Sequence, residues 1–156
     1  MAGIDARLAE LGIELPDVAP PVAAYVPAVV TGSYVYTSGQ LPFVAGALAA
    51  TGKVGDGHGL VPAGDAKDHA RACVLNALAA VRAELGSLDR VTRIVKLVGF
   101  VASDPSFTGQ PGVVNGASEL LAEVFGDAGR HARSAVGVAA LPLDAPVEIE
   151  LIVEFA

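Results

Sequence analysis

The chain has 156 residues, a formal net charge of -7 and a single cysteine, Cys73. This length fits one domain with one core. The acidic balance weighs against nucleic-acid binding, which depends on Lys and Arg at the phosphates, and the sequence has no continuous apolar run of about 18 residues that would span a bilayer. One cysteine excludes an intrachain disulfide, and the acidic N-terminal residues do not resemble a signal peptide. We therefore expect a cytoplasmic protein without membrane or nucleic-acid partners.

Apolar residues far outnumber the charged residues that would cover the surface of a monomer. Hydrophobic residues make up 53% of the chain and charged residues 17%. Because monomeric proteins rarely expose large apolar patches, part of this surface is expected to be covered by other subunits. The composition therefore predicts an oligomer.

Residues 1–21 are expected to form an N-terminal helix and linker within a single domain that spans the chain. Apolar side chains recur at helical spacing over residues 3–12, which predicts a short amphipathic helix. Pro16, Pro20 and Pro21 then favour an extended linker, because proline cannot continue a helix.

The next segment has the pattern of a β-hairpin followed by a long loop. Runs rich in Val, Tyr and Thr lie between Val26 and Ser38 and flank Gly32, which predicts two strands joined by a tight turn. Six glycines fall within residues 43–64, and this stretch is predicted to be a loop.

Two amphipathic helices and the strand between them are predicted for the middle of the chain. Asp65 is expected to be the N-cap of a helix whose apolar residues recur at three- and four-residue steps until Gly86. The apolar run over residues 94–101 is typical of a buried strand, and residues 104–112 have the composition of a loop. A second helix is predicted over residues 113–125, where the apolar spacing recurs before a glycine.

The C-terminal tail is predicted to contain two strands, residues 134–141 and 146–155, joined by a Pro-rich turn. In the last strand apolar residues alternate with mostly acidic ones, so one face is apolar and the other acidic. The order of elements predicts an α+β fold, a mixed sheet with both long helices packed on one face. The other face would be free to line the interior of an oligomer.

The sequence contains few of the common catalytic motifs. The chain has no phosphate-binding glycine motif of the Walker type and no dinucleotide fingerprint. His58, His69 and His131 lack the spacing of metal ligands and are expected on the surface or in loops, so we predict no metal site. Cys73 falls on the apolar face of a predicted helix, where a thiol is normally an inert core residue.

Arg133 and Glu148 are the residues that best suit chemistry on a small molecule. Arg133 stands just before the first C-terminal strand and Glu148 lies on the acidic face of the second, so antiparallel pairing across the turn would bring them together. Arg suits bidentate recognition of a carboxylate, and a neighbouring Glu can position water or move a proton. Spacing alone favours the simpler alternative, a cross-strand ion pair on the sheet surface. Tyr25 and Ser38, taken alone, are best explained as structural residues.

Several short motifs between residues 22 and 155 follow one another in a recognisable order. They are Tyr25-Val26 with Ser38-Gly39-Gln40-Leu41-Pro42, Val74-Leu75-Asn76-Ala77-Leu78 with Gly86-Ser87-Leu88-Asp89-Arg90-Val91, Asn115, Ala132-Arg133-Ser134-Ala135-Val136 with Leu141-Pro142, and Val147-Glu148-Ile149-Glu150. Together they resemble the reactive intermediate deaminase (Rid) family, whose members are also called YjgF-like or L-PSP endoribonuclease proteins. The C-terminal motifs are the most specific part of this resemblance.

The resemblance implies a chorismate-mutase-like α+β fold and a homotrimer whose sheets line a central barrel. Three clefts would lie at the subunit interfaces, and each would bind a small-molecule carboxylate. In family members that act as enamine or imine deaminases, 2-imino acids are hydrolysed to 2-oxo acids and ammonia without a metal or an organic cofactor. The chain would therefore be a self-associating hydrolase that acts on C=N bonds.

The resemblance also implies roles for individual residues. Arg133 matches the Arg that binds the substrate carboxylate, and Glu148 matches the Glu associated with the hydrolytic water. Tyr25 and Ser38 match residues that complete the pocket. All four residue types are present in this chain.

The chain departs from the family pattern at several positions. Asn115 matches a substrate-binding Asn of the second helix, but one extra residue separates it from Arg133. Ala135 replaces a frequent Cys at a substrate-binding position, where its backbone amide still suits contact with a ligand, and Gly137 replaces the usual Glu. The loop over residues 43–64 is longer and more apolar than is typical. These departures leave the choice of substrate open.

Three functions follow from these observations, in order of preference. The first is hydrolytic deamination of reactive 2-enamine or 2-imino acids. The second is a trimeric small-molecule-binding or regulatory protein without turnover. The third, ribonuclease activity, is a label carried by some family members and is disfavoured by the net charge of -7.

Overall fold

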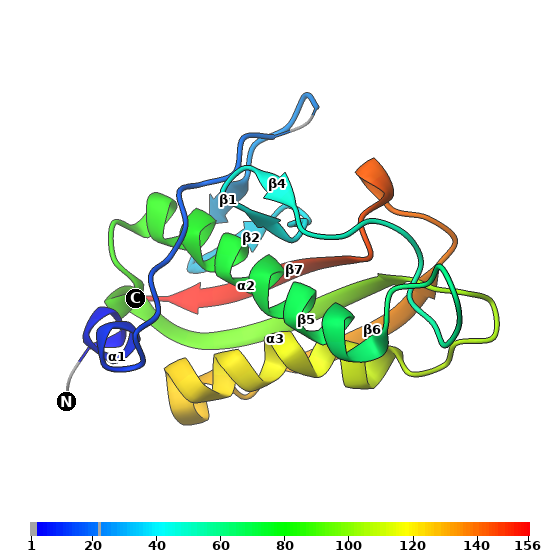
Figure 1. The fold of residues 1–156 in the computed structure, drawn as a ribbon. Helices are drawn as coiled ribbons and strands as arrows, with labels where there is room; N and C mark the ends of the chain where they lie inside the picture. The colour runs from blue at the N-terminus through cyan, green and yellow to red at the C-terminus, as the bar shows by residue number, and fades with distance from the viewer. Residues whose placement is uncertain (1–2, 22) are drawn as a thin grey trace.

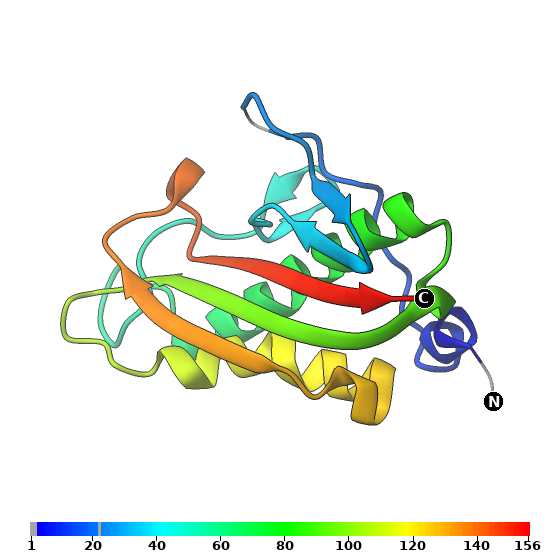
Figure 2. The same ribbon diagram turned by 180° about the vertical axis from the view of Figure 1, so that it is seen from behind.

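Two long helices cover one face of a five-stranded sheet, and the other face of the sheet is turned away from them (Figure 1, Figure 2). The structure is a computed structural model that describes residues 3–21 and 23–156. None of the helices in these residues is long and apolar enough to cross a membrane. The elements in chain order are α1 (Ile4–Glu10), β1 (Ala28–Thr31), β2 (Tyr34–Thr37), β3 (Phe43–Val44), β4 (Ala47–Leu48), α2 (Ala63–Leu85), η1 (Leu88–Arg90), β5 (Val91–Ala102), α3 (Gln110–Phe125), η2 (Gly126–Gly129), β6 (Ala132–Val138), η3 (Pro142–Asp144) and β7 (Val147–Phe155).

Strand β7 occupies the centre of the sheet, whose order is β1-β2-β7-β5-β6. It runs antiparallel to both of its neighbours, β2 and β5, whereas β5 and β6 form a parallel pair. The expected pairing of the two C-terminal strands, β6 and β7, is wrong, because β5 lies between them. The reason is that α3 connects β5 to β6 as a parallel crossover, which leaves the place between β2 and β5 for β7.

The predicted alternation along β7 is confirmed. Val147, Ile149, Leu151 and Val153 are each no more than 1% exposed and belong to the hydrophobic core. Glu148 and the other alternate residues are more exposed and face the opposite side. Burying an apolar side chain of this size contributes about 1.5–3 kcal/mol, so β7 is a major source of the stability of the fold.

Both long helices begin earlier than the sequence predicts. Helix α2 begins directly after Pro62, so Asp65 lies in its first turn and is not the N-cap. Helix α3 begins at Gln110, within the stretch predicted as a loop, and Pro111 lies in its first turn. Proline is compatible with a first turn, where backbone N–H groups have no helical partner. The predicted end of α2 is confirmed, since Gly86 adopts the left-handed conformation with φ of 80°.

The remaining predicted elements are present with changed boundaries. The N-terminal helix is α1, and the hairpin around Gly32 consists of β1 and β2. Strand β5 is longer than predicted, and β6 begins at Ala132, so Arg133 lies within a strand rather than before it. The predicted loop over residues 43–64 contains the short hairpin β3-β4.

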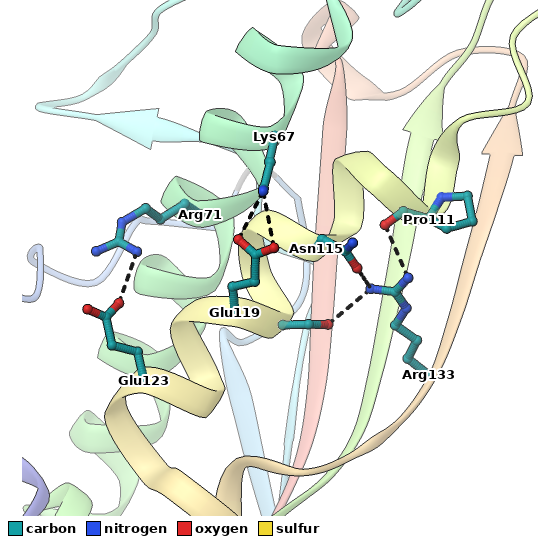
Figure 3. A network of polar contacts seen from close by, with 8 residues as sticks. Lys67, Arg71, Pro111, Asn115, Glu119, Glu123 and Arg133 are labelled. Carbon is teal, nitrogen blue, oxygen red and sulfur yellow. Dashed lines mark hydrogen bonds and ion pairs between the residues drawn. The ribbon is translucent and has the colours of Figure 1, made fainter.

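Helices α2 and α3 approach each other closely at Gly116, a buried residue of α3. A Cβ atom placed there would lie 2.0 Å from the backbone oxygen of Lys67. Two ion pairs join the same helices, Lys67 with Glu119 at 2.9 Å and Arg71 with Glu123 at 3.7 Å (Figure 3). Exposed ion pairs contribute little to stability. The missing side chain of Gly116 therefore determines how closely the helices pack.

Replacing Gly116 with Ala is expected to destabilise the fold by about 1–3 kcal/mol, because the added methyl group meets backbone rather than a flexible side chain. Gly112→Ala is the matched control on the same helix. No atom lies within 4 Å of its added Cβ, and alanine should stabilise the helix by about 0.5–1 kcal/mol. Denaturant unfolding measures both variants, and equal stabilities would contradict this account of the helix contact.

Candidate functional site

Arg133 lies on the edge strand β6 with its side chain against α3. In the sheet it stands beside Leu97 of β5, which is fully buried under the helices, so both side chains point to the helical face. Its Nη1 donates to Oδ1 of Asn115 at 2.8 Å and to Oγ of Ser118 at 3.1 Å, and its Nη2 donates to the carbonyl of Pro111 at 3.1 Å (Figure 3). The structure thus brings Arg133 and Asn115 together.

The guanidinium of Arg133 keeps part of its binding capacity. Both N–H groups of Nη1 and one of Nη2 serve these bonds, so the Nε–H and the second Nη2–H have no hydrogen-bond partner among the described residues. These two nitrogens form one edge of the guanidinium, which is a geometry that binds a carboxylate bidentately. None of the ion pairs among residues 3–21 and 23–156 includes Arg133. Its charge is therefore held by neutral acceptors and remains available to an anion.

Ser118 and His131 extend this network behind Arg133. Oγ of Ser118 lies 2.9 Å from Nε2 of His131, and Nδ1 of His131 lies 2.6 Å from the carbonyl oxygen of Gly129. Neither side chain was assigned a role from the sequence, where His131 was only expected on the surface or in a loop. The available signal was spacing, since Ser118 follows Asn115 by one helical turn and His131 precedes Arg133 by two residues.

Glu148 lies on the other face of the sheet, in a pocket of about 50 Å³. The N-terminal linker, the segment after β2 and the turn before β7 form this pocket, which includes Tyr25, Gly39 and Pro142. The carboxylate is half-buried, and its burial, followed by the nearby charge of Glu150, raises its pKa above the ordinary value. A raised pKa makes this carboxylate a stronger proton acceptor than an exposed glutamate. The pocket alone is too small for an amino-acid-sized ligand.

Gly39 and Ser38 allow Glu148 to take this position. A Cβ atom at Gly39 would lie 2.1 Å from Oε1 of Glu148, so any larger residue would push the flexible carboxylate away. The hydroxyl of Ser38 donates to the carbonyl of Val26 at 2.6 Å and fastens the end of the hairpin next to Tyr25. The structure thus places Tyr25 in the pocket of Glu148, while Ser38 supports the backbone beside it.

The positions that depart from the family pattern lie near Arg133. Ala135 follows Arg133 by two residues on β6 and packs against the edge of the core. At Gly137 an added Cβ would lie 2.8 Å from Nε2 of Gln110, whose amide donates to the carbonyl of Phe107 at 2.8 Å. The side chain of Gln110 therefore borders the space that a residue larger than glycine would need at this position.

The residues that the sequence groups together form two sets that do not meet within one chain. Arg133, Leu97 and Leu151 stand side by side across β6, β5 and β7, and the buried Leu151 faces the helices. Glu148 lies three positions before Leu151 and so leaves the sheet on the opposite face. The predicted proximity of Arg133 and Glu148 is therefore wrong for a single chain. The first set is Arg133, Asn115 and Ala135, and the second is Glu148, Tyr25 and Ser38.

Other reactive groups in the described residues do not form a site. Cys73 is fully buried, and burial raises the pKa of its thiol well above the ordinary value, which agrees with its predicted place in the core. Among residues 3–21 and 23–156, no three His, Cys, Asp or Glu side chains come together in a way that would hold a metal ion. The arrangement thus offers anion recognition at Arg133 and proton transfer at Glu148.

The fold defines a class of protein, a mixed α+β domain with helices on one face of a sheet in which β7 is central. The chain belongs to the family described as "YjgF/chorismate_mutase-like, putative endoribonuclease", whose model matches residues 5–155. The resemblance inferred from the motifs is thereby confirmed.

Three relatives show how far the likeness extends. Protein TCP17 of Trypanosoma cruzi is 47% identical over 154 residues, which cover 97% of this chain and 93% of that protein. The crystal structure of the protein Atu1372 from Agrobacterium tumefaciens, described as having unknown function, is 49% identical with a TM-score of 0.87 and covers 98% of this chain and 92% of that one. E. coli TdcF, solved with bound serine, is 30% identical with a TM-score of 0.66 and covers 89% of this chain and 94% of that one.

We expect the pKa of Glu148, measured by NMR of its isotope-labelled carboxyl group, to lie above the ordinary value of about 4.3, because burial disfavours the charged form. In Gly39→Ala the added methyl group displaces the carboxylate towards solvent, and the pKa should fall. Gly64→Ala is the control, since no atom lies within 4 Å of its added Cβ. A wild-type pKa at or below the ordinary value would show that the pocket is described wrongly.

Proposed function

We propose that the protein is a cytoplasmic hydrolase that converts reactive 2-enamine and 2-imino acids to 2-oxo acids and ammonia. The observation that carries this proposal is the guanidinium of Arg133, which neutral acceptors fix while its Nε and Nη2 edge stays available. A guanidinium presented in this way suits a small carboxylate substrate. Membership of the YjgF-like family, whose motifs this chain carries, supports the same assignment.

The proposed site forms between two copies of the chain in a homotrimer. Because Arg133 and Glu148 leave opposite faces of the sheet, a site that contains both takes Arg133 from one subunit and Glu148 from its neighbour. Contacts of this head-to-tail kind close into a ring when the rotation between copies fits, and three copies would give three equivalent clefts. In such a ring the neighbouring subunit would enlarge the small pocket at Glu148 into a cleft.

The reaction uses one water molecule, and Glu148 relays a proton twice; an enamine substrate first tautomerises to the imine as a proton moves from its nitrogen to C3. Arg133 holds the substrate carboxylate and so places the C=N carbon beside Glu148. Glu148 takes a proton from the water molecule while the water oxygen bonds to that carbon. Glu148 then passes the proton to the nitrogen, which gives a carbinolamine. Glu148 then takes the proton of the new hydroxyl group and delivers it to the nitrogen as the C–N bond breaks. The products are ammonia and the 2-oxo acid, and holding both reactants in one cleft supplies much of the acceleration.

Four further residues have supporting roles in this proposal. Tyr25 contacts the substrate in the cleft, and Ser38 holds the backbone that carries Gly39 beside Glu148. Asn115 fixes Nη1 of Arg133, and the backbone amide of Ala135 faces the same cleft. The raised pKa of Glu148, caused first by its burial, keeps a base available whose conjugate acid can return the proton.

A small-molecule-binding or regulatory protein without turnover is the second candidate. TdcF, a member of the same fold, was solved with bound serine, which supports an amino-acid-sized ligand for this chain under either function. Ribonuclease activity comes last, because a net charge of -7 offers few cations to the phosphates. Turnover of imines separates the first candidate from the second.

Imines generated from amino acids by an amino-acid oxidase provide the substrates for a kinetic test. Arg133→Lys keeps the charge but loses the planar edge, and it is expected to lower kcat/KM about 100-fold, mainly through KM. Glu148→Gln keeps the shape but loses the base, and it is expected to lower kcat by a factor of about 10²–10⁴. A variant with the wild-type rate would disprove the role of its residue. Carboxylate binding without any turnover by the wild type would favour the binding protein.

Co-expression of two inactive chains tests whether each site is shared between subunits. One chain carries Arg133→Ala and the other carries Glu148→Gln. Random pairing gives about one quarter of the clefts an intact Arg133 and an intact Glu148, so about a quarter of the wild-type activity should return. Each variant expressed alone is the control. Mixed oligomers without activity would contradict a site built from two subunits.

A further inference from the structure

Ser118 and His131 form a directional chain of hydrogen bonds that ends on Arg133. Nδ1 of His131 lies 2.6 Å from the carbonyl oxygen of Gly129, and since a carbonyl only accepts, Nδ1 carries the proton. In the neutral ring Nε2 is then an acceptor, so the hydroxyl of Ser118, 2.9 Å away, donates to it. The oxygen of Ser118 therefore presents its lone pairs to Nη1 of Arg133 at 3.1 Å.

The far end of this chain of bonds is fixed to α3. Gly129 is buried, and a Cβ atom at this position would lie 2.2 Å from the backbone oxygen of Leu121. This close approach gives the carbonyl that His131 contacts a defined position. Asn115, on the same helix, holds Nη1 of Arg133 at 2.8 Å. Both acceptors of Nη1 are therefore oriented by α3 and the turn that follows it.

We infer that Ser118 and His131 are positioning residues that set how tightly Arg133 binds the substrate carboxylate, an inference that rests on the function proposed above. An arginine side chain is flexible, and ordering it during binding weakens affinity. The hydrogen-bond chain orders Arg133 before the substrate arrives and presents its Nε and Nη2 edge in one orientation. Without His131, the hydroxyl of Ser118 loses the acceptor that fixes its rotation, so its oxygen no longer holds Nη1 of Arg133 in one orientation.

The simpler alternative is that these bonds only tie the loop before β6 to α3. A tie of that kind would change the stability of the protein but not the affinity of Arg133 for a carboxylate. Substitutions that keep the hydrogen-bonding atoms distinguish the two cases. Ser118→Thr retains the hydroxyl group, and His131→Gln offers Oε1 as an acceptor in place of Nε2.

Calorimetry with 2-oxobutanoate, a product-like carboxylate, measures this effect on the assembled protein without turnover. Ser118→Ala and His131→Phe are each expected to weaken binding about tenfold, whereas Ser118→Thr and His131→Gln should stay within about threefold of the wild type. His58→Phe replaces an exposed histidine and is the control with unchanged affinity. In imine hydrolysis, Ser118→Ala and His131→Phe should raise KM and leave kcat within about twofold.

Arg133→Lys separates this inference from the proposed function. If Arg133→Lys binds 2-oxobutanoate as tightly as the wild type, the carboxylate role of Arg133 is wrong and the inference fails with it. If Arg133→Lys weakens binding but Ser118→Ala and His131→Phe do not, the function stands and the positioning role is overturned. Nitrogen NMR of the wild type needs no variant. The neutral ring of His131 should carry its proton on Nδ1, and a proton on Nε2 would also overturn the inference.

Discussion

Strand β7 forms backbone hydrogen bonds with β2 on one side and β5 on the other, and the rest of the structure depends on this placement. The C-terminal strand joins the β1-β2 hairpin to the β5-α3-β6 unit. The hairpin and this unit do not pair with each other directly. Its apolar side chains complete the core under the helices, while Glu148 is left on the opposite face. Strand β6 lies at the edge, where Arg133 packs against α3. The pairing that builds the core therefore also separates the two sets of site residues.

Local patterns predicted most elements because helices and half-buried strands leave a periodic signal in the sequence. The end of α2 at Gly86 and the buried positions of residues 147–155 were both predicted correctly. The order of the strands leaves no such signal. Two consecutive strands joined by a short turn commonly pair, and the Pro-rich turn over residues 142–146 favoured that interpretation. The parallel crossover through α3, which depends on packing over a long stretch of chain, decided the arrangement instead.

The sequence predicted those residues of the candidate site that lie within a family motif. The motifs around Arg133 and Asn115 named two side chains that are hydrogen-bonded to each other in the structure. Ser118, His131 and Gly39 were missed as contributors, because each acts through contacts between segments that are distant in the sequence. Serine, histidine and glycine are common in loops and helices, and the spacing of Ser118 and His131 from Asn115 and Arg133 is by itself too common to identify them as contacts of a functional side chain.

Arg133 and Glu148 are partly buried charged residues, and neither has a partner of opposite sign in the part of the chain that the structure describes. Partial burial of an unpaired charge is unfavourable, and the raised pKa of Glu148 reflects this directly. Selection for stability alone would favour an ion pair for each partly buried charge within the chain. Selection for function tolerates the loss of stability that an unpaired charge causes. An anion bound at Arg133 would compensate one charge, and protonation of Glu148 would relieve the other. A carboxylate substrate that also needs a proton transfer would satisfy both charges in a single cleft. Because Arg133 and Glu148 leave opposite faces of the sheet, such a cleft requires a second copy of the chain.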